Sequence, residues 1–297
     1  MPRLYSGAMS VQRIRAVSAA RPASKRGVRA LAPLAGVLAA TLAGCGHTMT
    51  ADNQSRSIFE RFAPPTPAEA ADWATDPFDP DRRQRGLLLL ANAQWGGEPV
   101  YLRAYRAALE DEDPGVRASA VRALALHGSP EDALAIAAEL DAEGRLLRWE
   151  AARALQRLHN PRVIDGLITR LDRTEEPDAD VRAAAATALG QYARGRVYDA
   201  LVAALDDPSL LVTHAASGSL ETLTGEELGD DVDAWLALSA ERQDLFANRE
   251  AYVYPVFYRD RTVFEWVVPW LEPPNETSAS PVGMPAVATG SVDAGPR

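Results

Sequence analysis

The sequence predicts an all-α protein, a right-handed α-α solenoid of about four to five helix pairs that carries a small aromatic hairpin or extension near its C-terminus. The main observation is a recurring alanine-rich segment led by valine or leucine, which is clearest at residues 116–124. A period of about 20–50 residues is typical of solenoids, because each unit buries its apolar face only against its neighbours. The closing leucines of the copies follow one another at intervals of 34, 31, 34 and 31 residues: Leu90, Leu124, Leu155, Leu189 and Leu220.

Each copy predicts a helix, and a second helix is predicted before it. Val116, Ala120 and Leu124 fall on one stripe at helical spacing, and the many alanines allow neighbouring helices to approach closely. Another apolar-periodic stretch precedes each copy, for example over residues 197–205. The linking turn at residues 113–115 combines a capping acid with a proline, which suits a helix start. One unit is therefore a helix pair.

The pattern Asp-x-x-Val-Arg followed by Ala-x-x-Ala-Leu resembles bacterial HEAT-like repeats, over roughly residues 79–235. The resemblance implies a ladder between stacked units, in which a turn acid pairs with the arginine that heads each second helix. The terminal units depart from the pattern, since Arg82 replaces the valine and Thr213 the arginine. The resemblance also implies that Trp235 closes the last helix pair. The ladder positions are Asp113 with Arg117, Asp178 or Asp180 with Arg182, and Asp141 or Glu143 with Arg148.

The N-terminal residues predict an export signal that ends at a lipidated cysteine. A basic segment precedes a short apolar run, and Leu42-Ala43-Gly44-Cys45 resembles a bacterial lipobox with the only cysteine of the chain at its end. Cys45 would then carry the lipid anchor, and Gly46 favours the outer membrane. An ordinary signal peptide that happens to contain a cysteine is the alternative. The true start could be Met9 or later.

Composition divides the chain further and excludes a class of partner. Seven cations and no acids precede Cys45, which leaves 24 cations against 41 acids and a net charge of about −17 in the remainder. Nucleic-acid binding needs clustered Lys and Arg, so it is not expected. The predicted regions are a signal peptide at 1–44, a flexible tether at 45–78, the solenoid at 79–245, an aromatic capping or docking segment at 246–272, and a disordered tail at 273–297.

No catalytic or cofactor motif is present. A single cysteine excludes thiol chemistry and Cys-based zinc sites once it is lipidated. His127 and His159 end successive second helices, but without nearby carboxylates they predict polar helix ends rather than a metal site. We therefore expect no enzyme activity, no cofactor, no metal and no small-molecule substrate.

Two surfaces remain as candidates for binding a protein. In HEAT-like arrays the second helices line the concave side, which places Arg122, Trp149 and Arg153 in its middle; Trp and Arg are frequent interface anchors. Packing between repeats is the alternative role for Trp149. The second surface is the aromatic segment, which alternates like a strand around residues 252–258 and is β-branched and aromatic over 262–270. It either caps the array or docks on a partner, and its candidate contact residues are Tyr254, Tyr258 and Trp266.

The sequence thus predicts a non-catalytic scaffold that binds an unidentified protein in the bacterial cell envelope, lipid-anchored at Cys45 and facing the periplasm. One alternative is a structural or assembly factor that docks on an outer-membrane or cell-wall complex through the aromatic segment. A third is a subunit that positions a catalytic partner.

Overall fold

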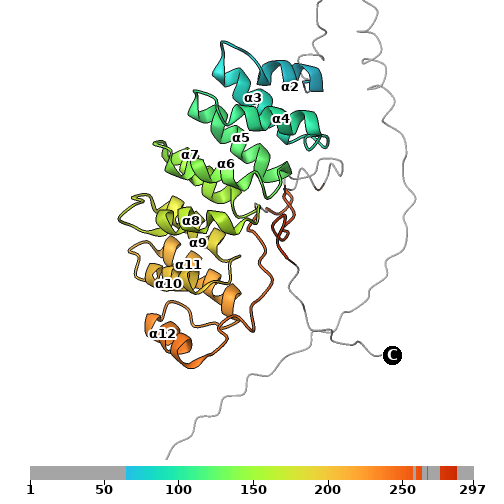
Figure 1. The fold of residues 1–297 in the computed structure, drawn as a ribbon. Helices are drawn as coiled ribbons and strands as arrows, with labels where there is room; N and C mark the ends of the chain where they lie inside the picture. Colours follow the sequence, from blue (N-terminus) through green and yellow to red (C-terminus); the bar gives the residue numbers. More distant parts are fainter. Residues whose placement is uncertain (1–64, 257–258, 263–265, 267–274, 286–297) are drawn as a thin grey trace, which may run out of the picture. The chain divides into compact units, whose positions relative to one another are not determined.

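The computed structural model describes residues 65–256, 259–262, 266 and 275–285, all within one compact unit, Ala63–Arg297. These residues form eleven α-helices and two short 3-10 helices, stacked in chain order (Figure 1). The all-α class predicted from the repeat is confirmed. The helices are α2 (Pro67–Ala74), α3 (Pro80–Ala91), α4 (Pro99–Ala108), α5 (Pro114–His127), α6 (Ala133–Ala138), η2 (Glu139–Asp141), α7 (Arg145–Ala154), η3 (Pro161–Val163), α8 (Ile164–Leu171), α9 (Ala179–Leu189), α10 (Gly195–Ala204), α11 (Leu210–Thr224) and α12 (Val232–Glu241).

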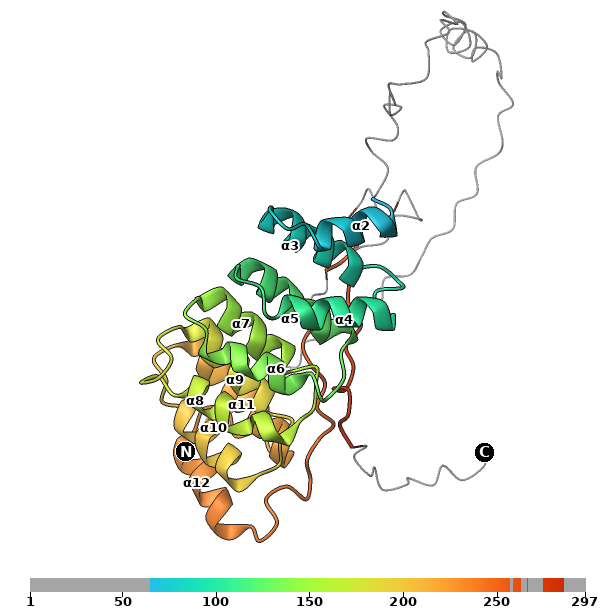
Figure 2. The same ribbon diagram turned by 45° about the horizontal axis from the view of Figure 1, so that its top comes forward.

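The helices pack in pairs along the chain. The pairs are α2 with α3, α4 with α5, α6 and η2 with α7, η3 and α8 with α9, and α10 with α11. The second helices α3, α5, α7, α9 and α11 contact one another in succession, and α12 packs against α10. Figure 2 shows the same order from a second direction. This is a HEAT- or armadillo-like solenoid of five pairs.

The closing leucines form the centre of the core. All five are at most 1% exposed, and alanines of the second helices fill the space between them. Burying a leucine side chain stabilises a fold by about 1.5–3 kcal/mol relative to leaving it exposed. The period in the sequence therefore marks the buried position of each unit.

The acids in the turns cap the second helices. The Asp113 carboxylate accepts hydrogen bonds from the backbone N–H groups of Gly115 and Val116, and Asp178 caps α9 in the same way. Such caps satisfy backbone donors that the first helical turn leaves free. The helix start expected at residues 113–115 is confirmed.

An arginine ladder joins the units, and its geometry differs from the one expected. Each arginine donates to a backbone carbonyl of its own turn, as Arg182 does to Glu176, and pairs with an acid of the following unit. In three of the four pairs the acid lies two residues before the N-cap residue of the second helix of its unit, whereas Glu139 lies five residues before Gly144. Asp113 and Asp178 are therefore free to act as caps. The pairs are Arg83 with Asp111, Arg117 with Glu139, Arg148 with Glu176, and Arg182 with Asp207.

The ladder stops at the fifth pair. Thr213 occupies the position of the arginine, and its hydroxyl donates to the backbone carbonyl of Asp207 in its own turn. It is too short to reach a further unit. Trp235 of α12 follows instead: it is fully buried, its indole N–H donates to Gly229 O, and Tyr198 Oη donates to its carbonyl. The expectation that Trp235 closes the array is confirmed.

The tether expected at residues 45–78 overlaps a helix. Thr66 and Glu69 form a reciprocal cap at the start of α2, and Ala70 is buried. The close approach of α2 to α3 depends on Gly86, because a Cβ there would lie 2.2 Å from the backbone nitrogen of Ala74. The chain before residue 65 lies outside the described residues.

The C-terminal region also differs from the expectation. The described residues 251–256 and 259–262 form no strand, and an isolated bridge joins Leu158 to Val282. Part of the tail predicted to be disordered is ordered against the array, since residues 275–285 contact the turn after α7 through this bridge. No helix among the described residues is both long and apolar enough to span a membrane.

Candidate protein-binding groove

The second helices and the C-terminal segment together line an open groove. We define the C-terminal segment as the described residues 250–256 and 275–285. The groove has a volume of about 670 Å³, and its floor is made of small side chains on α9 and α11. A floor of alanine and glycine lets a bound backbone approach the helices closely. The lining residues are Trp149, Arg153, Gln156, Asp180, Ala183, Ala184, Thr187, Leu211, His214, Ala215, Gly218, Ser219, Thr222, Tyr252, Val253 and Pro255.

Trp149 combines the two roles weighed for it. Its ring is half-buried and packs against the core, while the same side chain lines the groove. The guanidinium carbon of Arg153, one turn later on α7, lies 4.7 Å from the ring centroid. A cation over an indole face is attracted by the ring quadrupole. The pair therefore forms a partly fixed wall of the groove.

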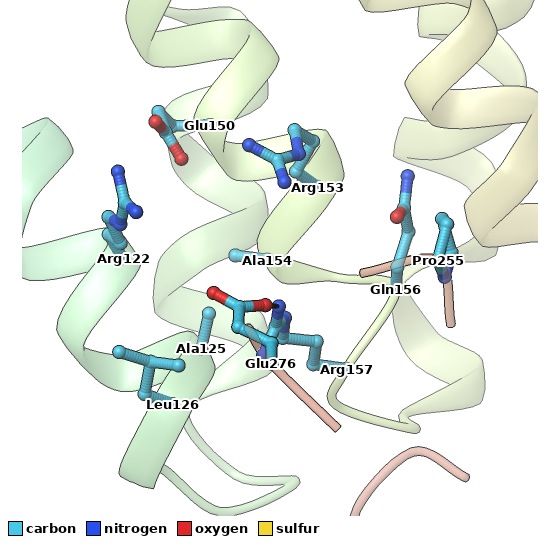
Figure 3. A pocket seen from close by; sticks show the side chains of 10 residues that line it. All are labelled: Arg122, Ala125, Leu126, Glu150, Arg153, Ala154, Gln156, Arg157, Pro255 and Glu276. Atoms are coloured by element: carbon cyan, nitrogen blue, oxygen red, sulfur yellow. Dashed lines mark hydrogen bonds and ion pairs between the residues drawn. The ribbon is translucent and has the colours of Figure 1, made fainter. Parts of the chain in front are cut away.

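A charged cluster lies next to this wall, where α5 and α7 meet the C-terminal segment. Figure 3 shows Glu150 between Arg122 and Arg153, with Arg157 paired to Glu276 nearby. The space between these side chains is about 30 Å³. That is room for about two water-sized groups. Arg122 is exposed and reaches the cluster from α5.

Glu150 is the unusual member of the cluster. Desolvation raises the pKa of its carboxyl, and the positive charges of Arg153, Arg122 and Arg157 act in the opposite direction. Among the described residues its carboxylate forms neither a hydrogen bond nor an ion pair within 4.0 Å. The carboxylate is thus stabilised by Coulombic attraction to the arginines without being in contact with them.

The C-terminal segment lies along the groove rather than over the end of the array. Its chain leaves the region of α12 and returns along the second helices (Figures 1 and 2). The backbone N–H of Glu250 donates to Thr222 O, and Val282 exchanges backbone hydrogen bonds with Arg157 and His159 in the turn after α7. At Gly283, φ is +83° and a Cβ would lie 2.3 Å from the Pro130 ring, so this position requires glycine. The end of the array is capped by α12 instead.

The predicted contact residues fall in different places. Trp149 and Arg153 line the groove, and Arg122 lies in the charged cluster next to it. The centroid of the Tyr254 ring lies 4.6 Å from the guanidinium carbon of Arg157, so this ring already makes a cation–π contact within the chain. Trp266 is 79% exposed and is not among the residues that line the groove. Cys45 and Tyr258 lie outside the described residues.

The two histidines take separate partners. His127 Nε2 lies 2.7 Å from Ala91 O, and His159 Nδ1 lies 3.0 Å from the Gln191 side-chain oxygen. Each contact links neighbouring units. Across the described residues there is no group of three or more His, Cys, Asp or Glu side chains that could hold a metal ion.

A family model described as HEAT repeats matches residues 102–176, 134–221 and 164–243. Together with the stacked helix pairs, this match decides the assignment. The chain is a HEAT-repeat α-solenoid protein. The matched residues of this HEAT array run from α4 to α12, and α2 and α3 add a pair before them.

Several solved structures are similar to the HEAT array. The YibA protein of Escherichia coli is 22% identical, with 59% of this chain and 63% of that chain covered and a TM-score of 0.45. Human deoxyhypusine hydroxylase in complex with glycerol is 28% identical, with coverages of 52% and 61% and a TM-score of 0.37. A designed armadillo repeat protein is 17% identical, with coverages of 61% and 95% and a TM-score of 0.43.

The chain therefore spans less than two thirds of the length of the first two of these proteins. No curated protein matches the sequence.

The sequence alone did not indicate three residues of the groove and of the charged cluster beside it. Gln156 donates to Ala184 O and fixes α7 against α9, and Arg157 binds the C-terminal segment. Glu276 is 119 positions from Arg157 in the chain. The helical spacing from Arg153 could have indicated Arg157, whereas nothing local could have indicated Glu276.

Proposed function

We propose that the chain is a non-catalytic scaffold that binds a protein partner in the groove of its HEAT array. The observation that supports this proposal is the groove itself. It is an open hollow with a volume of about 670 Å³, a floor of small residues and a wall formed by Trp149 and Arg153. Half-buried tryptophan and arginine side chains in a preformed hollow are typical anchors of protein interfaces. The use of Tyr254 within the chain argues against the aromatic segment as the docking surface.

We further propose that the scaffold is held at the cell envelope, on the outer membrane facing the periplasm. Support comes from the sequence Leu42-Ala43-Gly44-Cys45 and from Gly46. Several acyl chains on one residue would give stable anchoring, since each buried methylene contributes about 0.8 kcal/mol.

A Cys45→Ala variant tests the anchor. Without the thiol no lipid can be attached, so we expect the protein to leave the membrane fraction while the HEAT array stays folded. Cell fractionation followed by immunoblotting measures this, and circular dichroism of the purified variant checks the fold. Retention of the variant in the membrane fraction after a high-salt wash would contradict a lipid anchor at Cys45.

A crosslinking experiment tests the groove. A photo-crosslinking amino acid at Thr187, on the groove floor, is expected to capture one reproducible partner in cells, whereas the same amino acid at the exposed Asp199 of α10 is not. Trp149→Ala should lower recovery of this partner about tenfold or more, as truncation of an interface anchor does.

Leu146→Ala is the matched control for Trp149→Ala. Leu146 lies on the same helix, is 55% exposed and does not line the groove, so recovery should be unchanged. Equal recovery from the wild type and a folded Trp149→Ala variant would refute the groove as the binding surface.

A further inference from the structure

We propose that the groove selects an acidic, extended segment of its partner, with a partner carboxylate placed against Arg122 and Arg153 in the hollow beside Glu150. This inference rests on the proposed function, because it states the chemistry of the partner that the same groove would bind. Three observations support it: the state of the two arginines, the way the chain already uses the neighbouring Arg157, and the space between them.

Arg122 and Arg153 differ from the arginines of the ladder. Each ladder arginine is committed to an acid of the next unit, as Arg148 is to Glu176. In the part of the chain that the structure describes, neither Arg122 nor Arg153 has a carboxylate within 4.0 Å. Two guanidinium groups with donors to spare therefore face one cluster of a chain whose formal net charge is −10. A local positive site on an acidic protein attracts an anionic group.

Arg157 shows how an extended segment that carries a carboxylate fits this surface. It pairs with Glu276 and lies against the ring of Tyr254. Val282 also pairs with Arg157 and His159, in the turn after α7, through backbone hydrogen bonds, as an added strand would. The array thus already receives one extended segment by a carboxylate, an aromatic ring and backbone hydrogen bonds. Arg153 lies four residues before Arg157, in the last turn of α7, and lines the same hollow, so it can offer a similar contact to a partner.

The space also fits a carboxylate. The hollow of about 30 Å³ has room for about two water-sized groups, the size of two carboxylate oxygens. Its charged lining residues are Arg122, Glu150, Arg153, Arg157 and Glu276, of which Glu276 is paired with Arg157. Guanidinium groups bind carboxylates through charge-assisted, often bidentate hydrogen bonds. The rest of the segment could continue over the floor made by Ala183, Ala184 and Gly218.

Glu150 gives the inference a sharp test, because it places one negative charge beside the two arginines (Figure 3). For an acidic ligand this charge is unfavourable, so Glu150→Gln should strengthen binding, by about three- to tenfold. For a basic ligand Glu150 is the attractive group, and the same variant should weaken binding. The substitution is nearly isosteric and removes no ion pair or hydrogen bond among the described residues.

The probe is a displayed library of random decapeptides, selected on the immobilised full chain purified in detergent. We expect Asp and Glu to be enriched among the bound peptides relative to the unselected library. The Arg122→Gln, Arg153→Gln double variant should lose this enrichment, and Arg103→Gln, on the exposed face of α4, should keep it. Fluorescence anisotropy with the most enriched peptide then measures the affinity of Glu150→Gln.

Each result decides the question. Acid enrichment that disappears in the double variant, with tighter binding by Glu150→Gln, supports the inference. Neutral or basic enrichment, the absence of any selected peptide, acid enrichment that persists in the double variant, or weaker binding by Glu150→Gln overturns it. The proposed function fails separately, if Thr187 captures no partner in cells or Trp149→Ala leaves capture unchanged. A groove that captures a partner but shows no acid preference would therefore overturn this inference alone.

Discussion

Arg148→Ala is expected to lower the free energy of unfolding by about 3–5 kcal/mol. Arg148 donates to both oxygens of Glu176 at 2.6 and 2.9 Å, and Glu176 is fully buried. Without the guanidinium, a carboxylate in the interior loses its main counter-charge, and the nitrogen of Arg170 at 3.8 Å is a weak replacement. The ladder bond between the third and fourth pairs is lost as well. Urea denaturation followed by circular dichroism measures the change.

Arg145→Ala is the matched control on the same helix. Arg145 is 58% exposed and pairs with Asp180 at 3.0 Å, so solvent screens the pair and its loss should cost less than about 1 kcal/mol. In the Arg148→Ala background, Glu176→Gln should recover part of the stability, because it removes the buried charge that was left without its partner. Equal losses from Arg148→Ala and Arg145→Ala would show that the ladder adds no more than a surface pair.

Trp235→Ala is expected to cost about 3–5 kcal/mol. Its side chain is fully buried at the end of the array, where it meets Tyr198 edge to face with ring centroids 6.3 Å apart. Removing it leaves a cavity and also removes the indole bond to Gly229 O. Because each unit of a solenoid contacts only its neighbours, we expect the loss to be local.

Hydrogen exchange measured by mass spectrometry distinguishes a local from a global effect. In Trp235→Ala, exchange should accelerate in α10, α11 and α12 and remain unchanged in α3 and α5. Leu236→Ala changes the next residue on the same helix, which is 53% exposed, and should shift stability by no more than about 0.5 kcal/mol. Uniform acceleration along the whole array would contradict the view that Trp235 acts as an end cap.

The repeat period predicted the fold well because it records burial directly. The closing leucines occupy the same position in every unit, and capping acids recur before α3, α5 and α9, so they can be found by comparing the sequence with itself. The ladder could not be assigned in this way: acids stand at both Asp111 and Asp113, and only the stacking distance decides that Asp111 takes the arginine of the previous unit. A hydrogen bond from Arg83 holds the pKa of Asp111 below its ordinary value of 3.8, and burial acts against it.

The ends of the chain were predicted less well because their structure comes from packing rather than from local pattern. Residues 67–74 have the proline and alanine content of a linker, yet Gly86 allows them to dock on α3 as a helix. Residues 252–258 alternate like a strand, but the described part of this stretch lies along the groove. The contact of Arg157 with Glu276 joins positions too distant for any motif to connect.

The arginine ladder runs in one direction along the array, and this direction determines where a further repeat could be added with its ion pairs intact. Every internal unit receives an arginine from the unit before it and offers its own arginine to the unit after it. A duplicated internal unit would bring both halves of the link and could be inserted between α7 and α8 without leaving an acid alone. A unit added after α11 would meet Thr213, and its acid would find no arginine. The ladder can therefore accommodate a repeat duplicated within the array, whereas it cannot be continued by a repeat added after α11.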